Sequence, residues 1–182
     1  MPTFRLQREH TALLVVDIQE RLCAAMEPTA LERMLQRSVA ALEGARALAL
    51  PVLVTEQYPK GLGPTHARLK ERLGEGPAVE KLTFSACVPE VVERLGARRQ
   101  VLLVGMETHV CVFQTVRDLS ERGYTPLLCA DAVLSRHAED RRVGLELCRD
   151  AGAHLVTVEA ALFDLLERAG SPEFKKVSAA VR

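Results

Sequence analysis

The sequence has no excess of charge of either sign, because 24 lysines and arginines balance 24 aspartates and glutamates. A neutral chain offers no long-range attraction to phosphate backbones or to anionic membranes. The chain also has no apolar run approaching the roughly 18 residues that span a bilayer, and its first residues show no secretory leader pattern. We therefore expect a cytoplasmic protein that binds neither nucleic acid nor a membrane.

Signals for common cofactors and for cross-links are missing as well. No GxGxxG follows the first apolar run and no GxxxxGK[ST] occurs, so dinucleotides and nucleoside triphosphates lack their usual phosphate-binding loop. The five cysteines are an odd number, with no CxxC pair and no Cys/His cluster at zinc spacing, which argues against a disulfide framework and a structural metal. We expect reduced thiols, no metal and no cofactor.

What the sequence does contain is an alternation of two patterns. Short, nearly continuous apolar runs are typical of strands buried on both faces of a parallel sheet. Between them, apolar residues recur every three or four positions, as in helices. The alternation predicts an α/β fold, a three-layer α/β/α sandwich with a central, mostly parallel six-stranded sheet. The expected strands are 11–16, 51–54, 78–82, 100–104, 126–129 and 154–158, of which 78–82 is the weakest.

The length of 182 residues fits one domain. We expect that domain to span 1–182, with its core at about 11–168 and a C-terminal tail at 170–182. One further segment, the arginine-dense stretch 136–142, also contains acids, and such mixed charge at helical spacing indicates an exposed helix face.

Three residues of strong chemical character stand at the ends of expected strands. Asp17 follows the first strand, Lys81 lies in the weak strand, and Cys111 comes soon after 100–104 at the start of a helix. In a parallel sheet these ends meet at one edge, where ligands bind. A helix N-terminus lowers the pKa of a thiol, and its N–H groups can receive an oxyanion. Each residue alone also has an ordinary explanation: a capping acid, a surface lysine and a core cysteine.

Several separated strings resemble the isochorismatase-like cysteine hydrolases. They are D-x-Q at 17–19, K-x-x-F-S at 81–85 and above all G-M-E-T-H-V-C-V at 105–112, and the likeness extends from residue 11 to about 163. With T-E-Q-Y-P-K-G-L-G at 55–63, the chain looks most like isochorismatase domain-containing proteins of unassigned substrate. The resemblance implies the Rossmann-like isochorismatase-like hydrolase fold and a homodimer or larger homo-oligomer.

The resemblance also implies a catalytic triad of Cys111, Asp17 and Lys81. Asp17 would take the thiol proton, Cys111 would attack a carbonyl carbon to form an acyl-enzyme, and Lys81 would hold Asp17. The family pattern further implies a cis peptide bond between Met106 and Glu107, with the N–H groups of Glu107 and Cys111 as the oxyanion hole.

Two departures from better-known members narrow the expected substrate. Nicotinamidases resemble one another in a metal site built from Asp-x-His and a further histidine, and the matching stretch 56–66 lacks this set. Isochorismatase itself lacks the nucleophilic cysteine, whereas this chain retains Cys111. We expect a metal-independent hydrolase acting on C–N bonds other than peptide bonds, in a small amide, carbamoyl or related substrate. By position Gln19, Tyr58, Phe84 and His109 are candidate pocket residues, although each could equally be core or rim.

Two other functions fit the same cysteine. Cys111 could be a redox or oxidant-sensing thiol, since a helix start that activates a nucleophile also activates it toward oxidants. Alternatively, the protein could be a non-catalytic oligomer that binds a metabolite. Asp17 and Lys81 distinguish these readings, because hydrolysis needs an acid–base partner and a redox thiol does not.

Overall fold

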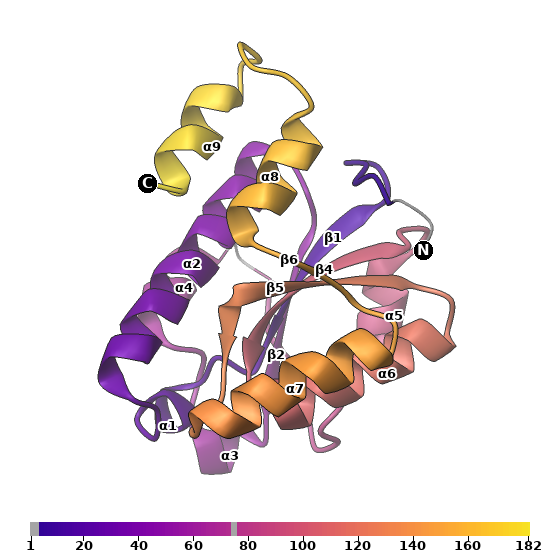
Figure 1. Cartoon of the computed structure of the whole chain (residues 1–182). Coiled ribbons are helices and arrows are strands. Elements are labelled where there is room, and N and C mark those ends of the chain that lie inside the picture. Colours follow the sequence, from indigo (N-terminus) through magenta and orange to yellow (C-terminus); the bar gives the residue numbers. More distant parts are fainter. Residues whose placement is uncertain (1–3, 74–75) are drawn as a thin grey trace.

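The computed structural model describes residues 4–73 and 76–182 and contains one six-stranded sheet (Figure 1). The strand order is β3-β2-β1-β4-β5-β6, and every pair of neighbouring strands is parallel. The predicted α/β sandwich is confirmed, and the sheet is parallel throughout instead of mostly parallel. The strands are β1 Thr11–Val16, β2 Val52–Gln57, β3 Val79–Lys81, β4 Gln100–Met106, β5 Thr125–Leu134 and β6 His154–Val156.

Helices cover both faces of this sheet. On one side lie α2, α8 and α9, and on the other lie α5, α6 and α7 (Figure 1). The helices are α1 Glu20–Cys23, α2 Pro28–Ala47, α3 Pro59–Leu62, α4 Ala67–Lys70, α5 Pro89–Leu95, the π-helix η1 Thr108–Val112, α6 Phe113–Glu121, α7 Ala138–Asp150, α8 Val158–Leu166 and α9 Phe174–Ala180.

The alternation of β1 side chains explains why the sheet is covered twice. Leu13 and Val15 belong to the apolar cluster on the α2 side, whereas Ala12, Leu14 and Val16 belong to the cluster on the α6 side. Successive side chains of a strand point to opposite faces, so a wholly apolar strand needs helices on both of them. At about 25 cal/mol per Å² of apolar surface, this double burial is the main stabilising contribution.

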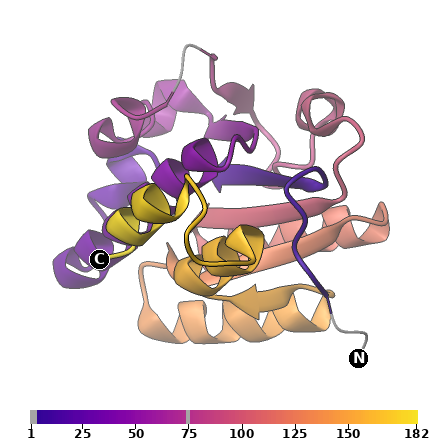
Figure 2. The same cartoon turned by 90° about the horizontal axis from the view of Figure 1, so that it is seen from above.

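The C-terminal segment is part of the same packed body. Helix α9 lies beside α2 (Figures 1 and 2), and its Val177 is fully buried in the α2-side cluster. The core therefore extends beyond the limit at residue 168 that the sequence indicated.

A glycine sets the distance between the two central strands. Gly105 in β4 has a φ of +139°, and a Cβ atom there would clash with the backbone oxygen of Val16 in β1. Only glycine fits this close approach without strain. The residues that follow β1 and β4 are thereby brought to one place.

Candidate functional site

The strand order reverses between β1 and β4, because the chain runs outward from β1 through β2 and β3 and then returns to add β4 on the other side. In such sheets the ligand crevice lies beyond the carboxyl ends of the strands at this reversal. Asp17 directly follows β1, and Glu107 directly follows β4. The reversal therefore marks the region between Asp17 and the segment that starts at Glu107.

Asp17 is a buried carboxylate with fixed partners. Its Oδ1 accepts a hydrogen bond from Thr55 Oγ1 at 2.7 Å, and its Oδ2 lies 2.6 Å from Lys81 Nζ. The residue has a φ of +50°, a left-handed conformation that is uncommon outside glycine and that clusters at functional sites. Burial raises the pKa of Asp17 above its ordinary value, and the Lys81 charge opposes this shift. A carboxylate with a raised pKa is a stronger base.

Lys81 is buried, and all of the hydrogen-bond partners of its ammonium are protein oxygens. Besides Asp17, its ammonium donates to Gln57 Oε1 at 2.8 Å, to the Thr83 carbonyl at 3.1 Å and to the Phe84 carbonyl at 2.9 Å. The last two acceptors belong to the loop that follows β3. Lys81 therefore fixes Asp17 relative to both β2 and this loop.

Cys111 lies in η1 with its side chain turned inward, so that the residue is only 6% exposed. Burial raises the pKa of its thiol to about 12, and the neighbouring Asp17 charge adds to the rise, whereas Lys81 lowers it. The expectation that a helix start lowers this pKa is therefore wrong. Desolvation and the neighbouring Asp17 charge keep Cys111 in its thiol form.

Contacts on two sides hold the turn that carries Cys111 in position. Thr115 Oγ1 donates to the Cys111 carbonyl at 2.6 Å and accepts from the Ala86 N–H at 2.8 Å, which links η1 to the loop after Lys81. From the opposite side, α7 approaches closely at Gly144, where a Cβ atom would lie 2.8 Å from the His109 nitrogen. The π-helix, a form often found at functional sites, is thus packed in one position.

The peptide bond between Met106 and Glu107, directly before η1, is cis. The Glu107 side chain is buried, and its Oε2 accepts from the Arg136 backbone N–H at 2.9 Å and from Arg136 Nε at 3.2 Å. This contact anchors the start of the segment 107–112, which carries Cys111, to the residue stretch that follows β5. His109 is held to the same loop, since its Nδ1 lies 3.0 Å from Ser135 Oγ.

The other candidate pocket residues occupy different surroundings. Gln19 is fully buried, and its side-chain amide bonds the backbone of Gln57 and Gly63, so its polar atoms are already used. Tyr58 and Phe84 are exposed on the loops after β2 and β3. A hollow of about 410 Å³ is lined by Tyr58, Lys81 and Leu82 among others. Gln19 therefore braces the loops, while the two aromatic rings lie on the surface.

Three residues that the structure places in this site were not predicted from the sequence. Thr55 and Gln57 contact Asp17 and Lys81, and Thr115 contacts Cys111. A signal existed for the first two, because Thr55 and Gln57 are polar residues at the end of a strand that begins with an apolar run. In the sheet register Thr55 pairs with Val16, the residue before Asp17, and Gln57 pairs with Lys81. Nothing in the local sequence distinguishes Thr115 from any other helical threonine.

The described residues contain neither a group of metal ligands nor a membrane-spanning helix. Over residues 4–73 and 76–182, no group of three or more histidine, cysteine, aspartate or glutamate side chains could hold a metal ion. Within the same ranges, none of the helices is long and apolar enough to cross a membrane.

Comparison with known proteins shows which family the chain resembles. The family model of the Isochorismatase domain matches residues 11–160. A secreted isochorismatase effector, Isc1, from Phytophthora sojae is 38% identical, covering 98% of this chain and 87% of its own. Isochorismatase domain-containing protein 2 from Xenopus laevis is 35% identical, covering 95% and 84%. The solved structure of MAR1 ribonuclease from Caenorhabditis elegans superimposes with a TM-score of 0.93 at 39% identity, covering 98% and 92%.

Proposed function

Because the chain belongs to the isochorismatase family, we propose that it is a metal-independent cysteine hydrolase that cleaves a small amide, carbamoyl or related C–N substrate. One observation carries the proposal. A buried carboxylate, Asp17, contacts both a buried ammonium, Lys81, and the Cys111 thiol at the reversal point of the sheet. These are a nucleophile, a base and a group that orients the base.

In the proposed first step, Asp17 accepts the thiol proton while the sulfur of Cys111 attacks the carbonyl carbon. The carbonyl oxygen becomes an oxyanion, which receives hydrogen bonds from the backbone N–H groups of Glu107 and Cys111. When the C–N bond breaks, Asp17 returns the proton to the departing nitrogen. An acyl-enzyme on Cys111 and a free amine or ammonia result.

In the second step, water attacks the acyl carbon and gives a proton to Asp17. The C–S bond breaks, the acid product leaves, and the proton returns to the sulfur of Cys111. Lys81 keeps Asp17 in place and balances its negative charge whenever the carboxylate is ionised. No metal is needed, because Asp17 performs both proton transfers.

The raised thiol pKa favours this coupled route over a preformed thiolate. With a pKa of about 12, only about one thiol in 10⁵ is ionised at pH 7. An oxidant-sensing thiol needs no acid–base partner, so the buried Asp17–Lys81 pair favours hydrolysis over the redox-sensing alternative. A thiol that loses its proton only as it attacks needs a base in contact with it, and Asp17 occupies that position.

The burial of Cys111 limits the size of the group that can react with it. Because Cys111 is 6% exposed, only a small group can reach its sulfur. Tyr58 and Phe84 on the neighbouring loops are proposed to contact the rest of the substrate, together with His109, which lies in the same helical turn as Cys111. A homo-oligomer remains a prediction. So does a cytoplasmic location, since the Phytophthora sojae relative is named a secreted protein.

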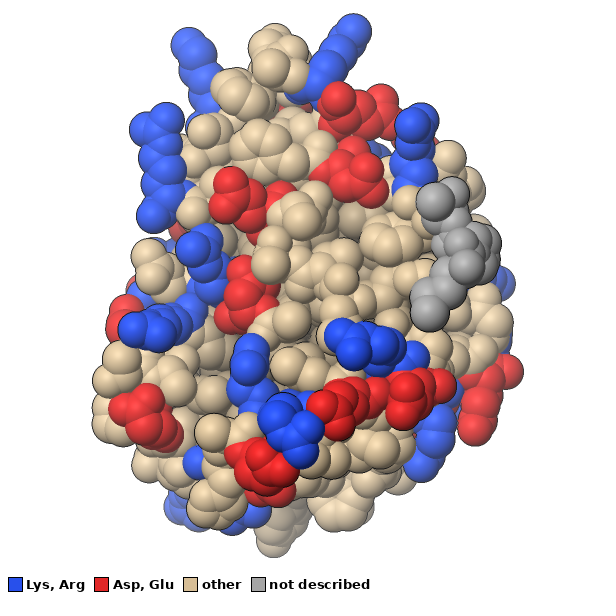
Figure 3. Space-filling model, in the orientation of Figure 1, with Lys and Arg blue, Asp and Glu red and all other residues tan. Residues whose placement is uncertain are grey.

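RNA is the competing substrate, because the Caenorhabditis elegans relative is described as a ribonuclease. Our proposal favours a small molecule for two reasons. The chain is neutral overall, and on the face seen in Figure 3 basic and acidic side chains interleave without a broad basic surface. In addition, the triad is buried, whereas a polymer needs an open groove.

A hydrolysis screen tests the proposal. Purified protein is incubated with EDTA and a panel of small primary amides, carbamoyl compounds and N-acyl amines, and released ammonia or amine is measured. A single-stranded RNA is included in parallel. We expect turnover of at least one C–N compound that survives EDTA, disappears in Cys111→Ala and persists in Cys87→Ala. RNA cleavage without any C–N turnover, or turnover unaffected by Cys111→Ala, would contradict the proposal.

A further inference from the structure

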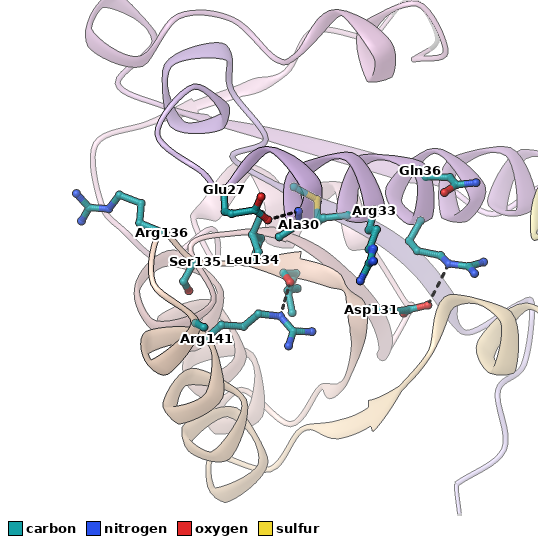
Figure 4. A pocket seen from close by; sticks show the side chains of 13 residues that line it. Glu27, Ala30, Arg33, Gln36, Asp131, Leu134, Ser135, Arg136 and Arg141 are labelled. Atoms are coloured by element: carbon teal, nitrogen blue, oxygen red, sulfur yellow. Dashed lines mark hydrogen bonds and ion pairs between the residues drawn. The ribbon is translucent and has the colours of Figure 1, made fainter.

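A cleft of about 670 Å³ lies between α2, the second half of β5 and the start of α7 (Figure 4). Its volume is in the range of small-molecule sites. Apolar side chains form part of its wall: Ala30, Met34, Val133, Leu134 and Ala138. Asp17, Lys81 and Cys111 are not among its lining residues, so this cleft differs from the proposed catalytic site.

Two arginines face each other across the cleft. Arg33 extends from α2 into the space, and Arg141 extends toward it from α7 on the opposite wall (Figure 4). Arg141 donates from Nε to the Val133 carbonyl at 3.0 Å and from Nη2 to the Ala130 carbonyl. Both acceptors are neutral. The Arg141 guanidinium is therefore held in place without being neutralised.

Arg33 is also without a neutralising partner. Among residues 4–73 and 76–182, no hydrogen bond or ion pair joins its side chain to another group. The adjacent Glu27 uses both carboxylate oxygens to cap α2, accepting from the N–H groups of Thr29 and Ala30 at 2.8 and 2.6 Å. Those backbone hydrogen bonds are the main reason that the pKa of Glu27 is lowered, and the Arg33 charge contributes least.

The remaining charges of the cleft reduce this excess but do not cancel it, because Glu27 keeps one negative charge while its hydrogen-bond donors are neutral. Asp131 accepts from the Val158 N–H at 2.9 Å and lies 3.8 Å from Arg37 Nε. Arg136 pairs with Glu107 and extends away from the cleft (Figure 4). The segment that contains Arg136 and Arg141 is thus not simply an exposed helix face. One of its arginines is turned into the molecule.

We infer that this cleft binds an anionic small molecule, whose carboxylate or phosphate bridges Arg33 and Arg141 and whose apolar part packs against Met34 and Leu134. Two like charges that converge on a partly enclosed space repel each other, and an anion between them removes that repulsion. Guanidinium groups bind carboxylate and phosphate oxygens in a planar, two-pronged geometry. This inference does not depend on the hydrolase proposal.

The test is titration calorimetry at low salt with three probes: benzoate, phenyl phosphate and benzyl alcohol. The alcohol matches benzoate in its ring but carries no charge. We expect one saturable site for at least one of the two anions, binding at least tenfold more weakly for the alcohol, and marked weakening in 0.5 M NaCl. Which anion binds better identifies the headgroup.

Three variants locate the site. Arg33→Gln is expected to weaken anion binding at least tenfold, and its fold should be unaffected because the side chain is exposed and unbonded. Arg141→Gln should have the same effect, with its folding checked by circular dichroism. Arg46→Gln is the matched control, because Arg46 is an exposed arginine of the same helix away from the cleft. The control should bind within twofold of the wild type.

Several outcomes would overturn the inference. They are the absence of saturable binding for both anions, equal binding of benzyl alcohol, or anion binding that Arg33→Gln leaves unchanged. Sedimentation velocity adds another. If Arg33→Gln changes the assembly state but not anion binding, the cleft is a contact between subunits.

Discussion

Replacement of Lys81 by methionine isolates the energetic role of the buried ion pair. Methionine matches the aliphatic part of lysine but removes an ammonium that donates to Asp17 and to three neutral oxygens. Both charged side chains are essentially inaccessible to solvent, so water cannot replace the lost partner. The Asp17 carboxylate is left buried and uncompensated.

We expect Lys81→Met to lower the free energy of unfolding by about 3–5 kcal/mol, as is usual when one partner of a buried pair is removed. For a chain of this length about 1 kcal/mol shifts the melting temperature by about 2–4 °C, so we expect a fall of about 6–20 °C. In Asp17→Asn/Lys81→Met neither charge is buried. The loss in free energy of unfolding of this double variant should be smaller, by at least about 2 kcal/mol, than the losses of Asp17→Asn and Lys81→Met added together.

The loss in Lys81→Met should depend on pH in a defined direction. Burial already raises the pKa of Asp17, and Lys81 is the main influence that lowers it, so its removal raises the pKa further. The native variant then binds a proton that the unfolded chain releases near its ordinary pKa of 3.8. Both folded proteins lose stability as the pH rises above 3.8, but the loss in the wild type ends at its own, lower folded pKa of Asp17. Stability relative to wild type should therefore fall once the pH exceeds the pKa of Asp17 in the folded wild type, until Asp17 is ionised in the folded variant.

Urea unfolding at pH 5 and pH 8, followed by circular dichroism, measures both effects. Lys60→Met is the control, because Lys60 is an exposed lysine of α3, and it should change stability by less than about 0.5 kcal/mol. The reasoning is refuted if Lys81→Met loses less than about 1 kcal/mol at pH 8. It is also refuted if the loss is larger at pH 5 than at pH 8.

Three further predictions concern the nucleophile segment. Thr115→Val should cost about 1–3 kcal/mol, because it leaves the buried Ala86 N–H without its acceptor, and thermal unfolding beside Thr115→Ser would show it. Gly144→Ala should destabilise the protein and impair any reaction at Cys111, because the new methyl group meets the backbone of His109 at 2.8 Å. Gly76→Ala, with open space around it, should do neither, and equal effects of the two would count against the packing argument. The Cys111 thiol should stay protonated below about pH 10, so the difference in thiolate absorbance at 240 nm between wild type and Cys111→Ala should be flat there; a step below pH 8 would show that burial does not control this thiol.

Much of the architecture was predictable because burial on two faces leaves a direct mark on a sequence. A strand such as 11–16 has no polar position, and each of its side chains belongs to one of the two cores. All six strands were expected near the places where they occur. The catalytic candidates Asp17, Lys81 and Cys111 became visible as a set only through the resemblance to a family, since each alone is an ordinary residue.

The features that escaped prediction depend on long-range contacts. The thiol pKa was expected to be low because a helix start was visible in the sequence, whereas the burial that raises this pKa was not. The left-handed backbone of Asp17 has no local signature in the sequence. Likewise Arg33 and Arg141 are more than a hundred positions apart, and only the packing of α2 against the end of β5 brings them to one cleft.

The central claim is that Asp17 activates Cys111 as a base, and iodoacetamide labelling of the native protein tests it most directly. Cys87 is an internal reference, because it is also 6% exposed and its pKa is also raised by burial, but it lacks a carboxylate in contact. Labelling rates at both sites are followed by mass spectrometry from pH 5 to 9. Asp17→Asn/Lys81→Met removes the base without leaving an unpaired lysine. We predict that Cys111 reacts at least tenfold faster than Cys87 in the wild type and no faster in the double variant. Equal rates at the two cysteines in the wild type, or fast labelling of Cys111 that persists in the double variant, would contradict the account.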